Sequence, residues 1–173
     1  MSDAVQTQND VVNLEEVSSS GRPFLKSGSY TVRCLSCEKQ TSKKSNPMLV
    51  FKWEICSPES VKDGTTGKDV KITGLQLTDW IVLTDNGFPK LKALHKTLKL
   101  PMTISRSKPD TKVYIGKAVK VSMSTETSVL KDDNTNEPIL DDENKPITTN
   151  NYKIGRFNSA DLEHTMASDS VAF

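Results

Sequence analysis

Apolar residues in the middle of this chain recur at every second position, and this period constrains the fold more than any other feature of the sequence. Between residues 48 and 55, one set of alternating positions is entirely apolar: Leu49, Phe51, Trp53 and Ile55. The alternation is typical of a β-strand with one face in a core and the other in solvent. Strand signals also occur at 29–41, 70–83, 113–127 and 151–157, and the second of these is expected to bend at Gly74.

One segment has a different period. In residues 88–100 the apolar positions fall at helical spacing, Pro89 suits a first helical turn, and Pro101 ends the segment. The predicted order is three strands, one helix and two strands. We therefore predict an all-β domain with one inserted helix, specifically a five-stranded antiparallel OB-fold barrel. Other small β folds also accept an inserted helix, so the order alone leaves them open.

The predicted domain occupies residues 22–157, between two segments without Lys or Arg. Residues 1–21 are expected to form a flexible arm, and 158–173 a flexible acidic tail. The sequence has no apolar run of about 18 residues and no secretory signal, which predicts a cytoplasmic protein without membrane contact. Three cysteines are too few, and odd in number, for a disulfide framework.

Charge is strongly segregated, although the net charge is only +1. All 23 basic residues lie between Arg22 and Arg156. Four of the 22 acids precede this stretch and three follow it, so 15 lie within it and its net charge is +8. Residues 131–145 hold six acids and two lysines, so the rest of the stretch carries about +12. A basic body of this kind suits a polyanion, since Lys and Arg displace counterions from phosphates. A solvated surface of mixed charge is the alternative.

Several short motifs in residues 24–157 occur in a recognisable order. They are Gly28-Ser29-Tyr30-x-Val32, Glu38-Lys39-x-Thr41-Ser42-Lys43, Asn46-Pro47-Met48, Gly67-Lys68, Gly116-Lys117-x-Val119-x-Val121 and Asn151-Tyr152-Lys153-Ile154. In this pattern the chain resembles a family of bacteriophage single-stranded DNA-binding proteins with an OB-fold. The resemblance implies a non-enzymatic role in phage DNA replication, recombination or repair, in the cytoplasm of the infected host cell.

The last residue carries a second resemblance. Phe173, preceded by Asp169, is similar to the acidic, Phe-ending tails with which bacterial single-stranded DNA-binding proteins dock onto partner enzymes. The present tail has fewer acids and lacks a proline before the phenylalanine. The resemblance implies that Phe173 binds phage or host replication proteins.

Binding single strands without sequence preference requires cations for the phosphates and aromatic faces for the bases. The predicted nucleic-acid-binding residues are Arg33, Lys43, Lys44, Lys52, Trp53, Lys71, Trp80, Tyr114, Lys117, Tyr152 and Arg156. Lys43 and Lys44 occupy the turn between the first two strands. The alternation favours a core position for Trp53, and Trp80 cannot be assigned to a face. The helix lysines are expected only to solubilise its outer side.

Other constellations do not indicate catalysis, a cofactor or a metal. Cys34 and Cys37 have the spacing of a zinc site, but residues three apart on a strand point to opposite faces and further ligands are lacking. Residues 132–143 imitate a calcium loop, with Glu137 replacing the necessary glycine, and are interpreted as a solvated loop in which calcium binding stays open. No nucleophile–base set or nucleotide-binding glycine motif is present.

The predicted function is thus a sequence-independent single-stranded DNA-binding protein rather than an enzyme. The rival hypothesis is a virion or scaffold β-domain whose acidic segments mediate protein assembly without nucleic acid. Whether the chain forms a homo-oligomer is left open by the sequence.

Overall fold

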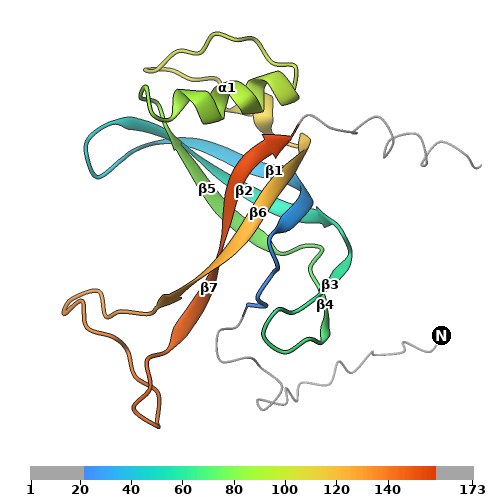
Figure 1. Cartoon of the computed structure of the whole chain (residues 1–173). Helices are drawn as coiled ribbons and strands as arrows, with labels where there is room; N and C mark the ends of the chain where they lie inside the picture. The colour runs from blue at the N-terminus through green and yellow to red at the C-terminus, as the bar shows by residue number, and fades with distance from the viewer. Residues whose placement is uncertain (1–21, 159–173) are drawn as a thin grey trace, which may run out of the picture. The chain divides into compact units, whose positions relative to one another are not determined.

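The structure, a computed structural model, describes residues 22–158 of the chain. The predicted arm at 1–21 and the tail from 159 onward, including Phe173, lie outside the described residues. The elements are β1 (Gly28–Thr41), β2 (Pro47–Ser57), β3 (Ser60–Lys62), β4 (Asp69–Lys71), β5 (Gln76–Val82), α1 (Phe88–Thr97), a 3-10 turn η1 (Lys112–Tyr114), β6 (Ala118–Val129) and β7 (Thr148–Asn158) (Figure 1). Within residues 22–158, the predicted mostly-β content, single α-helix and five-stranded antiparallel sheet are confirmed.

The main sheet has the strand order β5-β2-β1-β6-β7. Strands β1, β2 and β5 follow one another along the chain and lie side by side in that order. The next strand of this sheet, β6, returns to pair with the free edge of β1. This arrangement is a Greek key. Among the described residues the hydrogen-bonded sheet ends at β5 and β7, so the pairing does not show the predicted closed barrel.

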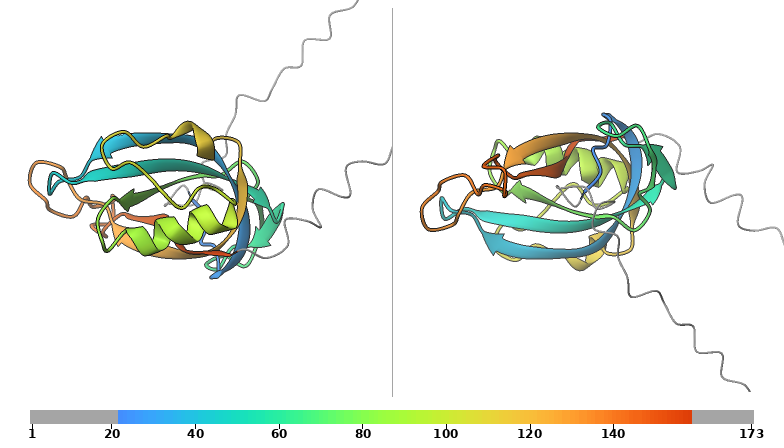
Figure 2. Two further views of the ribbon diagram at one scale, coloured as in Figure 1. Left: turned by 90° about the horizontal axis from the view of Figure 1, so that it is seen from above. Right: turned by 90° about the horizontal axis from the view of Figure 1, so that it is seen from below.

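The sheet curves because different parts of β1 pair with two different strands. Its residues 31–41 pair with β2, whereas residues 28–33 pair with β6. The register with β2 shifts between Cys34 and Ser36, and a bulge of this kind bends a strand. Figure 2 shows β1 and β2 on one side of the resulting interior and β7 on the other.

The concave side of the sheet holds the apolar core. The alternating face of β2 is fully buried, as its sequence predicts, and Phe51 stacks on Trp53 with ring centroids 5.4 Å apart. Tyr114 of η1 meets Phe51 edge-on at 5.1 Å. Large aromatic side chains therefore supply much of the packed volume.

Helix α1 lies across one end of the sheet and contributes Leu91, Leu94 and His95 to the core (Figure 1). The N-terminus of α1 requires the backbone of Gly87 to pack closely against that of Val82. A Cβ atom on Gly87 would lie 1.8 Å from the carbonyl oxygen of Val82, so only glycine fits there. The helix ends three residues before the predicted boundary at Leu100.

The stretch 70–83 is not the single bent strand that the sequence predicts. Strand β4 ends at Lys71, Gly74 turns the chain with a φ of +88°, and β5 begins at Gln76. β4 pairs only with β3, in a separate two-stranded sheet. Glycine adopts a positive φ without strain, so Gly74 can turn the chain sharply. It therefore separates the two sheets rather than bending one strand.

Backbone contacts divide the described chain into two units. The larger comprises residues 24–126 and 151–158, and the smaller comprises residues 22–23 and 127–150. We call residues 127–150 the acidic hairpin. In it, Asp132 accepts hydrogen bonds from the N–H groups of Asn134 and Thr135, at 2.8 and 2.9 Å, and Asp141 accepts equivalent bonds two and four residues on. Both carboxylates thus close tight turns.

Candidate nucleic-acid interface

An open pocket of about 650 Å³ lies between the β1–β2 turn, the end of β5 and the start of α1. It is lined by Ser42, Lys43, Lys44, Asn46, Trp80, Ile81, Val82, Thr84, Asn86, Gly87 and Lys90. Three of the predicted DNA-binding residues, Lys43, Lys44 and Trp80, are brought together here. All of these residues belong to the larger unit.

Trp80 is the most exposed large apolar side chain of the described residues, at 60% of its surface. Its exposure follows from the alternation along β5, in which Leu77 and Ile81 point into the core and Trp80 points out. On the outer face it lies opposite Val50 of β2. An exposed tryptophan on a sheet offers a planar face to a ligand, and such residues are typical of binding surfaces.

The β1–β2 turn holds two lysines beside this ring. The N–H of Ser42 donates to the carbonyl of Asn46 at 2.8 Å, and the N–H of Asn46 donates to the Ser42 hydroxyl at 3.1 Å. These bonds fix the base of the turn, while Lys43 and Lys44 at its tip are exposed. Neither lysine forms an ion pair with a described residue, so both charges are available to an anion.

The outer face of β5, β2 and β1 extends this surface. Lys52 is exposed on β2, directly between Thr78 of β5 and Ser36 of β1. Arg33 lies on the same face but is bound to Glu54, with 2.6 Å between Nη2 and Oε2. The hydrogen bond to Glu54 raises the pKa of Arg33, and the carboxylate offsets much of its charge. Lys52 therefore contributes more to the local positive charge than Arg33.

Lys90 has a structural role that the sequence does not reveal. Its Nζ lies 2.8 Å from Asp79 Oδ1 on β5 and 3.2 Å from the carbonyl of Ile154 on β7. It thereby links the two strands at the ends of the sheet. Burial raises the pKa of Asp79, and the nearby Lys90 charge opposes that rise. The expectation that the helix lysines only solubilise α1 is wrong for this residue.

Three predicted stacking residues lie in the core instead. Trp53 and Tyr114 are fully buried, and Tyr152 is 6% exposed. The Tyr114 hydroxyl donates to His95 Nε2 at 2.7 Å, and burial raises its pKa. Rings without an exposed face cannot stack on bases, so the predicted DNA-binding role is wrong for these three residues, while the core position that the alternation favours for Trp53 is confirmed.

The remaining predicted residues do not line the pocket. Lys71 on β4, Lys117 before β6 and Arg156 on β7 are exposed at separate places of the larger unit. Phe173 lies outside the described residues. Conversely, Thr84 and Asn86 line the pocket although neither is among the predicted binding residues.

The two core cysteines do not alternate as expected. Cys34 and Cys37 are both buried, because the bulge between Cys34 and Ser36 shifts the phase of β1. Burial raises the pKa of Cys34 to about 11 and that of Cys37 to about 12, so both are neutral thiols. Within residues 22–158 no three His, Cys, Asp or Glu side chains are grouped as metal ligands. The same residues contain no helix of the length and apolarity needed to span a bilayer.

Comparison with protein-family models and with curated proteins gave no match.

Proposed function

We propose that this protein binds single-stranded DNA without sequence preference and coats it without altering it. The observation that carries the proposal is the exposed ring of Trp80 beside the unpaired charges of Lys43 and Lys44. Non-specific binding of single strands combines these two elements, since every base has a face that stacks and every nucleotide has a phosphate. The outer-face Lys52 extends the positive surface across β2, so that single-stranded DNA can run from β5 toward β1.

We also propose that the curved sheet belongs to the OB-fold. That fold is a partly open, five-stranded Greek-key barrel, which binds oligonucleotides on the face of its second and third strands and on the loop between its first two. In this protein those elements correspond to β2, β5 and the turn at residues 42–46. The pocket is built from that turn and β5, so its location supports the fold assignment as well as the function.

The cellular role follows from the motif resemblance. A protein of this kind protects and presents single strands during phage DNA replication, recombination or repair, in the cytoplasm of the infected host cell. It needs no cofactor and performs no covalent step. Phe173, through its similarity to Phe-ending tails, is the proposed contact with replication proteins.

Intrinsic fluorescence tests the proposal, because the chain has only two tryptophans and they differ in exposure. Trp53 is fully buried and Trp80 is 60% exposed. We expect oligo-dT of about 30 nucleotides to quench part of the emission, and Trp80→Phe to abolish that quenching while the Trp53 emission remains. Equal quenching in wild type and Trp80→Phe would refute Trp80 as the stacking platform. Absence of both quenching and complex formation at low salt would refute the proposed function.

A further inference from the structure

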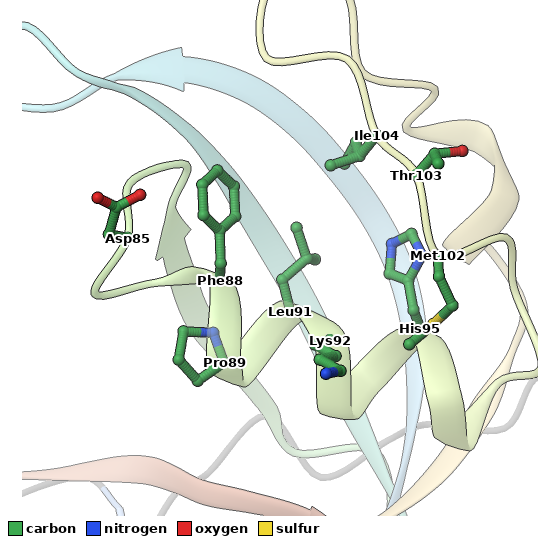
Figure 3. A pocket seen from close by; sticks show the side chains of 9 residues that line it. All are labelled: Asp85, Phe88, Pro89, Leu91, Lys92, His95, Met102, Thr103 and Ile104. Carbon is green, nitrogen blue, oxygen red and sulfur yellow. The ribbon is translucent and has the colours of Figure 1, made fainter.

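A second cavity, of about 680 Å³, lies beside α1 and is separate from the DNA-binding candidate pocket. Its apolar lining comes from Phe88 and Leu91 on the helix and from Met102 and Ile104 on the segment that follows. Figure 3 shows the helix side chains extending toward that segment, so the two walls face each other. Met102 is 57% exposed, which leaves the groove open to a partner.

The segment that carries the groove is basic. Residues 85–112 hold seven basic side chains and two acids, Asp85 and Asp110, a net charge of +5; Asp85 and Lys92 line the groove itself, and Lys90 is paired with Asp79. The guanidinium of Arg106 lies 4.8 Å from the ring centroid of Phe88 at the edge of the groove. Its ion pair with Asp85 is long, 3.7 Å, and solvent-exposed, so it neutralises little of that charge.

The acidic hairpin has the complementary character. Four of its aliphatic side chains are exposed by 40–49%: Val129, Leu130, Ile139 and Leu140. Backbone hydrogen bonds from Ile139 to Leu130, and from Ile147 to Ile139, at 2.9 and 2.8 Å, hold these segments together. Residues 131–145 surround them with six acids against two lysines, a net charge of −4. Exposed aliphatic groups inside an acidic rim are unusual for a loop that only contacts water.

We propose that the acidic hairpin of one molecule docks into the α1 groove of a second copy of this chain. An apolar groove carried by a stretch of net charge +5 and an apolar hairpin of −4 match in both hydrophobicity and charge. Each copy carries both halves of the contact, and the halves are different surfaces. The contact is therefore heterologous, and repeating it builds rings or open chains, or pairs two copies when each hairpin occupies the other's groove.

This inference goes beyond DNA binding and does not depend on it. None of the four apolar residues of the groove lines the candidate DNA pocket. Head-to-tail contacts of this kind would place successive molecules along a coated strand, but they form in the absence of any strand. Experiments without DNA therefore test the contact even if the proposed function fails.

Sedimentation velocity of the full chain without DNA, from about 5 to 200 µM, is the primary measurement. We expect the weight-average sedimentation coefficient to rise with protein concentration at 50 mM NaCl, and the apparent dissociation constant to increase at least tenfold at 500 mM because the contact is between opposite charges. A species that stays monomeric at every concentration at low salt would overturn the proposal.

Two variants separate the halves of the contact. Ile139→Ser/Leu140→Ser removes exposed apolar groups from the hairpin, and Met102→Glu places a carboxylate in the groove; these side chains are 41–57% exposed, so the core is unaffected. Each variant alone is expected to be monomeric. The hairpin variant keeps an intact groove, and the groove variant keeps an intact hairpin. An equimolar mixture is therefore expected to form a 1:1 heterodimer and nothing larger.

Ile115→Ser is the matched control, since Ile115 is 49% exposed and lines neither cavity. It should self-associate like the wild type, and thermal melts should show that all variants are folded. Continued self-association of either docking variant, or a mixture that remains monomeric, would overturn the docking of hairpin into groove.

Discussion

Replacing Trp80 by alanine provides a quantitative test of the interface. Stacking of one base on an aromatic side chain contributes about 1–3 kcal/mol. Since 1.4 kcal/mol corresponds to a factor of ten, Trp80→Ala should raise the dissociation constant for oligo-dT about 5- to 150-fold. The ring is uncharged, so the slope of log affinity against log salt concentration should not change. On a plot of log affinity against log salt concentration, the wild-type and variant lines should therefore be parallel, with the variant at lower affinity.

Fluorescence anisotropy of a labelled oligo-dT, titrated at four or more salt concentrations, measures both quantities. The 40% of the Trp80 surface that is buried amounts to about 100 Å², whose loss at about 25 cal/mol per Å² reduces stability by up to about 2.5 kcal/mol. Urea unfolding must therefore show that the variant is folded at the assay temperature. Ile115→Ala, an exposed apolar truncation outside the pocket, is the control. A dissociation constant within twofold of wild type, or a changed salt slope, would refute the stacking role.

Three further predictions concern charges. Lys43→Ala/Lys44→Ala should make the same salt slope shallower by about 1.4, because each phosphate contact on a single strand contributes about 0.7; an unchanged slope in the same titration would contradict phosphate contacts by the turn. Lys90→Met should lower the free energy of urea unfolding by about 1–3 kcal/mol, because it leaves the carboxylate of Asp79 buried without its cation; the double variant Lys90→Met/Asp79→Leu should recover part of that loss, and no recovery would contradict the linking role. Burial acts to raise the pKa of Asp63, but hydrogen bonds from the N–H groups of Thr66, Phe24 and Thr65 outweigh it and lower that pKa. Because the folded pKa lies below the unfolded value, the ionised group stabilises the fold above about pH 4, and that stability is lost as the pH falls through the folded pKa. The melting temperature of Asp63→Asn should accordingly depend less on pH between about 5 and 2 than that of wild type. Parallel plots of melting temperature against pH would contradict a stabilising role of the Asp63 carboxylate.

The secondary structure was largely predictable because its periods are clean. The alternation in residues 48–55 places Phe51 and Trp53 on the inner face, and both are fully buried. The helical spacing from Phe88 gives α1 to within three residues. The closure of the sheet was not predictable, since it depends on how β1 bends at its bulge and on the distance between β5 and β7, and neither leaves a periodic signal.

The candidate site was predictable only in part. The lysine pair was evident from its position in a turn, whereas the face of Trp80 became clear only once β5 was separated from β4 at Gly74. Tyr114 looked suitable for stacking because it has a polar tip, but that tip is satisfied inside the core by His95. Partners that lie far apart in sequence, such as Lys90 and Asp79, are set by tertiary packing and cannot be read from local pattern.

Binding of single-stranded DNA can be measured directly by titrating a fluorescent oligo-dT of about 30 nucleotides at several salt concentrations, with duplex of equal length as competitor. We predict tight binding to the single strand, poor competition by the duplex, and affinity that falls steeply as salt rises. Absence of binding at low salt, or equal competition by duplex, would contradict this prediction and favour an assembly domain that does not bind single strands.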